Sequence, residues 1–179
     1  RREQFALLPS TFEFKLLRQY EQIYRASLNE YRELNYVIAT NVRELAEGAM
    51  ARGDKRVVDL AVQFFNTFLR ATVNARDVRT AFNVLNQYRL LAEAALKRNE
   101  GRVAVSVAKY FKYYGQVAFH MDLGFILETA AYDLCQLNEL ALDLHVKERA
   151  EMLRVFLQVD KEGEGEKKEA ALRGVRKAQ

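Results

Sequence analysis

Half of the 179 residues are hydrophobic, and 28 basic and 24 acidic residues leave a net charge of +4. This composition excludes a disordered chain, and the single cysteine excludes an intramolecular disulfide. No run approaches the roughly 20 apolar residues that a bilayer span needs. Because one proline and eight glycines leave few helix breakers, we predict an all-α protein of about six or seven helices.

The first predicted helix begins at Ser10, because Ser10-Thr11-Phe12-Glu13 fits a capping box. Apolar residues then recur at helical spacing as far as about Arg52. We therefore expect one long N-terminal helix, or two that are nearly collinear.

Within this segment, Leu17, Tyr24, Tyr31 and Ile38 fall seven residues apart, a spacing typical of coiled coils. Tyrosines disfavour a tight two-stranded seam. The favoured interpretation is that this helix packs across the rest of the chain, and a homo-oligomer formed through it is the alternative.

Turn residues predict where the later helices begin and end. Gly53-Asp54 ends the first segment and caps the next helix, and Asp77 caps the one after it. Further turns are predicted at Asn99-Glu100-Gly101, Asp122-Leu123-Gly124 and His145–Lys147. The last amphipathic segment contains Met152, Leu153, Phe156 and Leu157.

The chain repeats itself at a spacing of 46 residues. Leu45–Met50 reappears as Leu91–Leu96 and, more weakly, as Leu137–Leu142. Self-similarity of this kind predicts stacked antiparallel helical hairpins, which form a short α-solenoid. A compact, pseudo-symmetric helix bundle leaves the same trace in the sequence.

We expect a single helical-repeat domain over residues 1–160, followed by a charged linker at 161–179. The end of this linker, Ala170 to Gln179, is rich in helix-forming residues. At the 46-residue spacing it stands where the first helix of a fourth unit would begin.

The period of 46 residues exceeds the 34 of a tetratricopeptide unit and lies in the HEAT and armadillo range, so the chain resembles these helical-repeat families. Residues Phe68–Phe82 are also similar to a helix-turn-helix segment in the cytoplasmic part of certain uncharacterised bacterial multi-span membrane proteins, although they lack its Ser-Pro and Asn-Asp-Pro turn. The second resemblance implies a cytoplasmic domain attached to membrane helices.

Two sets of charged residues are candidate partner-binding sites. The basic set lies in the predicted hairpin turns: Arg52, Lys55, Arg56, Lys97, Arg98 and Arg102. Such cations suit an anionic membrane surface or a phosphate backbone, or else they complement helix dipoles and keep the protein soluble. The acidic set, Glu47, Glu93 and Glu139, recurs at the 46-residue spacing. These carboxylates would bind a cation or a basic peptide, or else they are exposed helix formers or partners for the next repeat's arginine.

Catalytic chemistry is not expected. His120 and His145 lie far apart, Cys135 stands among leucines as a buried structural thiol would, and no cofactor or metal motif is present. The run Lys109–Tyr114 could stack nucleobases, but helical periodicity places Tyr110, Phe111 and Tyr114 mainly inward, and the mild net charge argues against nucleic acid.

We therefore expect a non-catalytic protein-interaction or scaffolding domain, located in the cytoplasm, with a protein or peptide partner. The alternative is a cytoplasmic regulatory domain of a bacterial membrane protein, whose basic edge faces anionic lipid.

Overall fold

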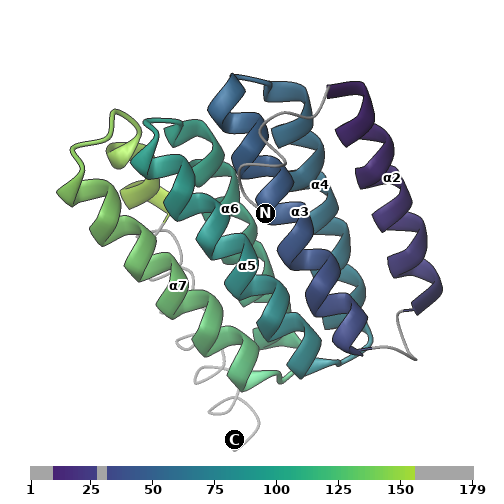
Figure 1. Ribbon diagram of the computed structural model, residues 1–179. Helices are drawn as coiled ribbons and strands as arrows, with labels where there is room; N and C mark the ends of the chain where they lie inside the picture. The colour runs from purple at the N-terminus through teal and green to yellow at the C-terminus, as the bar shows by residue number, and fades with distance from the viewer. Residues whose placement is uncertain (1–9, 28–31, 156–179) are drawn as a thin grey trace, which may run out of the picture.

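The computed structural model describes residues 10–27 and 32–155, and within these ranges all regular secondary structure is helical (Figure 1). The helices are α2 (Ser10–Ser27), α3 (Arg32–Arg52), α4 (Lys55–Asn74), α5 (Val78–Lys97), α6 (Gly101–His120) and α7 (Gly124–Asp143). Residues 149–155 form a further helical stretch. The all-α prediction is confirmed, whereas the predicted boundary at residue 160 and the segment 161–179 lie outside the described residues.

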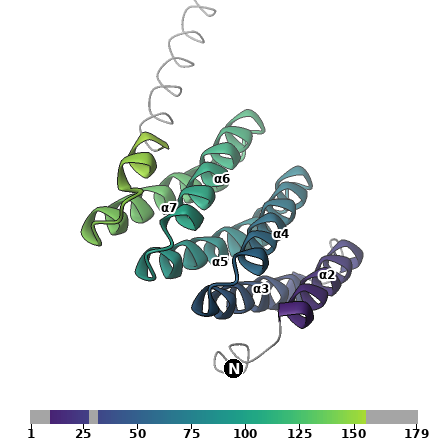
Figure 2. The same ribbon diagram turned by 90° about the horizontal axis from the view of Figure 1, so that it is seen from above.

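The helices form two layers (Figure 2). In the α3–α5–α7 layer, α5 contacts both of its neighbours, and in the α2–α4–α6 layer, α4 does the same. Consecutive helices also contact each other from one layer to the other. Since each helix buries one apolar face, the core lies between the layers and leaves the outer face of each layer to solvent.

Large aromatic side chains from both layers fill this core. The rings of Phe65 and Tyr88 are stacked with centroids 5.0 Å apart, and those of Tyr24 and Phe68 lie 3.8 Å apart. All four side chains are buried. The Tyr24 hydroxyl donates a hydrogen bond to the Phe68 carbonyl oxygen, which removes the cost of burying an unpaired polar group.

Three of the four rings in the run 109–114 belong to the core, as helical periodicity predicted. Phe111 and Tyr114 are buried, and Tyr110 is half-buried against the same cluster. Lys109 points to solvent and lies 2.6 Å from Glu151. The rings of Tyr110, Phe111 and Tyr114 are therefore not free to stack on bases, whereas Tyr113 is exposed.

The five turns that follow α3 to α7 share one backbone geometry. Each contains a residue in the left-handed conformation: Gly53 (φ 74°), Arg76 (φ 55°), Asn99 (φ 60°), Asp122 (φ 57°) and His145 (φ 49°). After α3, the Gly53 amide donates to the Met50 carbonyl oxygen and the Asp54 amide donates to that of Ala49, at 3.1 and 2.9 Å. This Schellman motif recurs in every one of these turns and satisfies the last carbonyl groups of each helix.

The two predicted aspartate caps are confirmed. The Asp54 carboxylate accepts from the Val57 amide at 3.4 Å, and Asp77 accepts from the Thr80 amide at 3.2 Å. Each cap satisfies an amide at a helix start that has no partner within the helix. The Ser10 side chain, predicted to do the same for the first helix, is not among the described side chains.

The prediction of one long or two nearly collinear N-terminal helices is wrong. Helix α2 ends at Ser27, α3 begins at Arg32, and the two helices pack against each other. This arrangement buries Leu17 and Tyr24, each 1% exposed, which a straight continuation of α3 would leave in solvent. The sequence feature that indicated this helix end was Ser27, because serine side chains form hydrogen bonds to nearby backbone groups and so favour helix ends.

Candidate functional site

The outer face of the α3–α5–α7 layer is hollowed between α3 and α5. The hollow has a volume of about 390 Å³ and is lined by Arg43, Glu47, Leu90, Glu93, Ala94, Lys97 and Arg98. The structure thus brings together four residues singled out from the sequence, two from the acidic set and two from the basic set. The sequence did not identify Arg43, Leu90 and Ala94 as site residues. It indicates them only through their positions one or two helical turns from the predicted residues.

Arg43 links the two helices at this hollow. Its side chain is 8% exposed, its Nε donates to Gln87 Oε1 on α5 at 2.8 Å, and its guanidinium forms an ion pair with Glu47 on α3. A guanidinium buried to this extent is tolerated only when acceptors satisfy its N–H groups. Glu47 pairs with an arginine, but this arginine belongs to its own helix and not to the next repeat, as the sequence alternative had it.

The same arrangement recurs between α5 and α7. Arg89 Nε lies 3.3 Å from Asp133 Oδ1, and the guanidinium forms an ion pair with Glu93 on its own helix. Asp133 is 4% exposed, and its Oδ2 has no hydrogen-bond partner among the described residues. Burial raises the pKa of Asp133 to about 6, Arg89 acts to lower it, and Glu93 raises it further.

On α7 the corresponding position is occupied by Cys135 instead of a third arginine. Its Sγ lies 3.8 Å from Glu139 Oε1, and no cation of the described residues pairs with Glu139, which is exposed. Cys135 itself is half-buried, so the prediction of a buried structural thiol is wrong. The reason is that no described helix of this layer lies beyond α7 to cover it.

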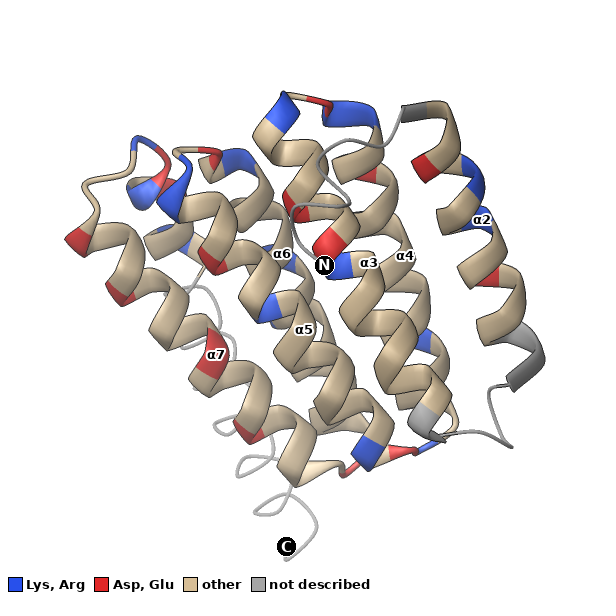
Figure 3. Ribbon diagram, viewed as in Figure 1, with Lys and Arg blue, Asp and Glu red and all other residues tan. Residues whose placement is uncertain are grey.

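The remaining basic residues lie mostly beside acids. Lys55 and Arg102 line a second hollow of about 160 Å³, which Asp54, Asp59 and Glu100 also line. Arg56 is exposed on the first turn of α4. Figure 3 shows blue and red ribbon close together at these turns, so the charges at this hollow largely offset one another.

Arg52, at the end of α3, forms an ion pair with a residue of α2. Its Nη2 lies 2.5 Å from both carboxylate oxygens of Glu13, whose side chain is fully buried. Burial raises the pKa of Glu13, and the hydrogen bond from Arg52 acts in the opposite direction. This ion pair ties the start of α2 to the end of α3.

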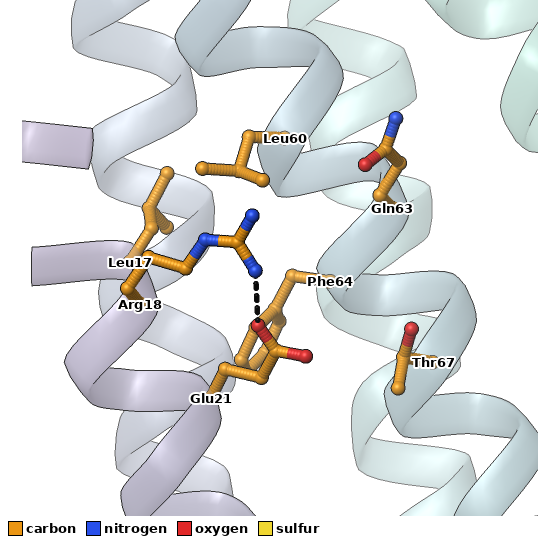
Figure 4. A pocket seen from close by; sticks show the side chains of 7 residues that line it. All are labelled: Leu17, Arg18, Glu21, Leu60, Gln63, Phe64 and Thr67. Atoms are coloured by element: carbon orange, nitrogen blue, oxygen red, sulfur yellow. Dashed lines mark hydrogen bonds and ion pairs between the residues drawn. The ribbon is translucent and has the colours of Figure 1, made fainter. Parts of the chain in front are cut away.

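A third, much smaller hollow lies between α2 and α4 (Figure 4). Its volume is about 70 Å³, and Arg18 and Glu21, which form an ion pair of 3.2 Å on α2, are among the residues that line it. Since a water molecule occupies about 30 Å³, this space suits solvent and not a ligand.

The described residues contain no group of three or more His, Cys, Asp and Glu side chains placed to hold a metal ion. His120 ends α6 and His145 lies in the turn after α7, and both are exposed. Neither lines the hollow between α3 and α5.

No protein-family model, curated protein or solved structure matches this chain. The packed, all-helical architecture is compatible with a helical-repeat domain. Among the described helices, none has both the length and the apolar character that crossing a membrane requires.

Proposed function

We propose that the chain is a short α-solenoid of antiparallel hairpins repeating every 46 residues, and that it acts as a non-catalytic protein-interaction domain. The turn geometry supports this repeat. The left-handed residues Gly53, Asn99 and His145 follow one another at that spacing, as do Arg76 and Asp122. Non-glycine residues adopt this conformation at a cost, so their recurrence reflects a recurring structural need.

A side-chain link supports the same repeat. Arg43 contacts Gln87, and Arg89 contacts Asp133. Both residues of the second pair lie 46 residues after their counterparts in the first. Stacked units of this kind contact only their neighbours and expose a continuous outer face, which repeat proteins use for binding.

The hollow between α3 and α5 is the observation that carries the binding proposal. Leu90 and Ala94 give it an apolar surface, and Glu47 and Glu93 are already paired with arginines of their own helices. Lys97 and Arg98 are exposed and have no ion-pair partner among the described residues. The unpaired charge of the hollow is therefore positive, and it fits an acidic peptide that inserts one apolar side chain.

Fluorescence polarisation with two labelled helical peptides of roughly 16 residues tests this function. One carries leucines at helical spacing among glutamates, and in the other lysines replace the glutamates. We expect the acidic peptide to bind more tightly, and Arg98→Glu to weaken its binding about tenfold. Arg79→Glu is the matched control, because Arg79 is an exposed arginine at the opposite end of α5. Equal binding of the two peptides, or an equal loss in the control, contradicts the proposal.

Binding to an anionic membrane surface is a second candidate, and one helix favours it. The charged residues of α6 are all basic, namely Arg102, Lys109 and Lys112, and the same helix exposes Tyr113 and Phe119 by 51% and 50%. Basic and aromatic side chains on one face suit the headgroup region of a bilayer. Cosedimentation with phosphatidylserine vesicles at low salt tests it. Binding that Phe119→Ser reduces supports the membrane, and absence of binding rejects it.

A further inference from the structure

The lateral edge of α7 is uncovered at positions that are buried on α3 and α5. Met50, Leu96 and Leu142 occupy corresponding positions 46 residues apart, and their exposed fractions are 8%, 2% and 42%. Met50 and Leu96 are buried because another helix of the layer lies beside their own. Leu142 is exposed because no described helix lies beside α7 on that side.

A second set of corresponding positions shows the same change. Ala39 and Leu85 are fully buried, whereas Ala131 is exposed. Together with Glu128, Cys135 and Leu142, Ala131 forms one side of α7, which we call the α7 edge. The edge therefore has the apolar positions of a helix–helix contact but no described partner.

The charge of α7 indicates what would cover this edge. The helix carries Glu128, Asp133, Glu139 and Asp143 and no lysine or arginine (Figure 3). A partner helix with small apolar residues and an excess of basic side chains would complement both its charge and its apolar positions.

We propose that the α7 edge is the docking surface for residues 170–179 of this same chain, packed there as the next helix of the α3–α5–α7 layer. This segment contains Arg173, Arg176 and Lys177 and no acidic residue, together with Leu172 and Val175. The helices of the layer begin at Arg32, Val78 and Gly124, and the same step of 46 residues leads to Ala170. The inference rests on the repeat in the proposed function, but not on peptide binding.

The side-chain links set the register of this docking. Arg43 and Gln87 are 44 residues apart in sequence, as are Arg89 and Asp133. The same step from Cys135 leads to Gln179. Docking therefore places residue 179 beside the only cysteine of the chain.

Crosslinking in the full chain tests this register. In a Gln179→Cys variant, Cys135 and the new cysteine are the only thiols, so a short bismaleimide reports their proximity. We expect rapid intramolecular crosslinking that is independent of protein concentration and is lost in urea. Gly163→Cys is the matched control, because residue 163 lies closer to Cys135 in sequence but outside the docking segment, and we expect it to crosslink several-fold more slowly.

Charge reversal shows whether the acids of α7 hold the segment. Glu128→Lys with Glu139→Lys should lower the crosslinking rate of the Gln179→Cys variant several-fold, whereas Asp59→Lys, an equally exposed change on α4, should not. A rate no higher than that of Gly163→Cys overturns the proposal, and so does crosslinking between two molecules, which would assign the edge to a second copy. Circular dichroism of each variant verifies that it is folded. Since Lys97 and Arg98 are unchanged, peptide binding can be measured in the same variants, and failure of either idea is seen separately.

Discussion

The α3–α5 junction and the α5–α7 junction each contain a bridging arginine, but the two arginines have different acceptors. Arg43 donates to the neutral amide of Gln87, whereas Arg89 pairs with the carboxylate of Asp133, whose pKa is raised to about 6. An amide keeps its charge state at every pH, but a buried carboxylate must either keep its cation or take up a proton. The comparison indicates that the α3–α5 junction is insensitive to mild acid, whereas the α5–α7 junction responds to it.

Removing the arginine of the first junction should have the largest effect. Arg43→Met removes the guanidinium that pairs with Glu47 and donates to the buried Gln87, and we expect the free energy of unfolding at pH 7 to fall by about 3 kcal/mol. Urea unfolding followed by circular dichroism measures this. Arg79→Met, at an exposed arginine of α5, should change stability by no more than about 0.5 kcal/mol. A loss below about 1 kcal/mol for Arg43→Met would mean that the link contributes little.

Removing the arginine of the second junction should cost less and depend on pH. Arg89 is 24% exposed, and we expect Arg89→Met to lower stability by about 2 kcal/mol at pH 7. The loss should be about half as large at pH 5, because a protonated Asp133 no longer needs a cation. The loss in Arg43→Met should stay the same over this range. If both losses vary equally with pH, the distinction between the acceptors fails.

Asp133→Asn makes the second junction resemble the first. The pKa of Asp133 is higher in the folded chain than the usual 3.8, so the folded state binds the proton more tightly. The penalty for the charged carboxylate is full above about pH 6, and it is relieved as the pH falls toward 3.8. Between pH 7 and pH 5 this site should add about 1 kcal/mol to the stability of the original chain and nothing to Asp133→Asn. Unfolding curves at the two pH values measure the difference, and identical shifts in both proteins would assign it to other groups such as Glu13.

Placing an arginine at position 135 of α7 should have the smallest effect on the free energy of unfolding. Cys135→Arg places a cation one turn before Glu139, and we expect a gain of about 0.3 kcal/mol from this pair. Adding Glu139→Gln should remove the gain. If Cys135→Arg stabilises the chain equally with Glu139 absent, the added side chain acts through packing and not through charge.

The candidate site was predictable only in part. Glu47 and Glu93 were found because their block of sequence recurs, and Lys97 and Arg98 were found as basic residues at a turn. Arg43 was missed, since one arginine among many carries no signal of its own until Gln87 is placed opposite it. The division of the N-terminal segment into α2 and α3 was missed because the apolar stripe at Leu17 and Tyr24 looks the same whether the next helix continues or folds back.

The sequence by itself determined helices α4 to α7, their turns and two of their caps. These depend on interactions within a few residues, such as the amphipathic period of α4 and the bond between Asp77 and the Thr80 amide. Only the tertiary structure decided which arginine meets which acceptor, that Arg52 holds Glu13, and that Leu142 is uncovered while Leu96 is buried. Periodicity specifies which face of a helix is buried, but the identity of the covering helix depends on contacts between residues about 40 or more positions apart, which no local pattern records.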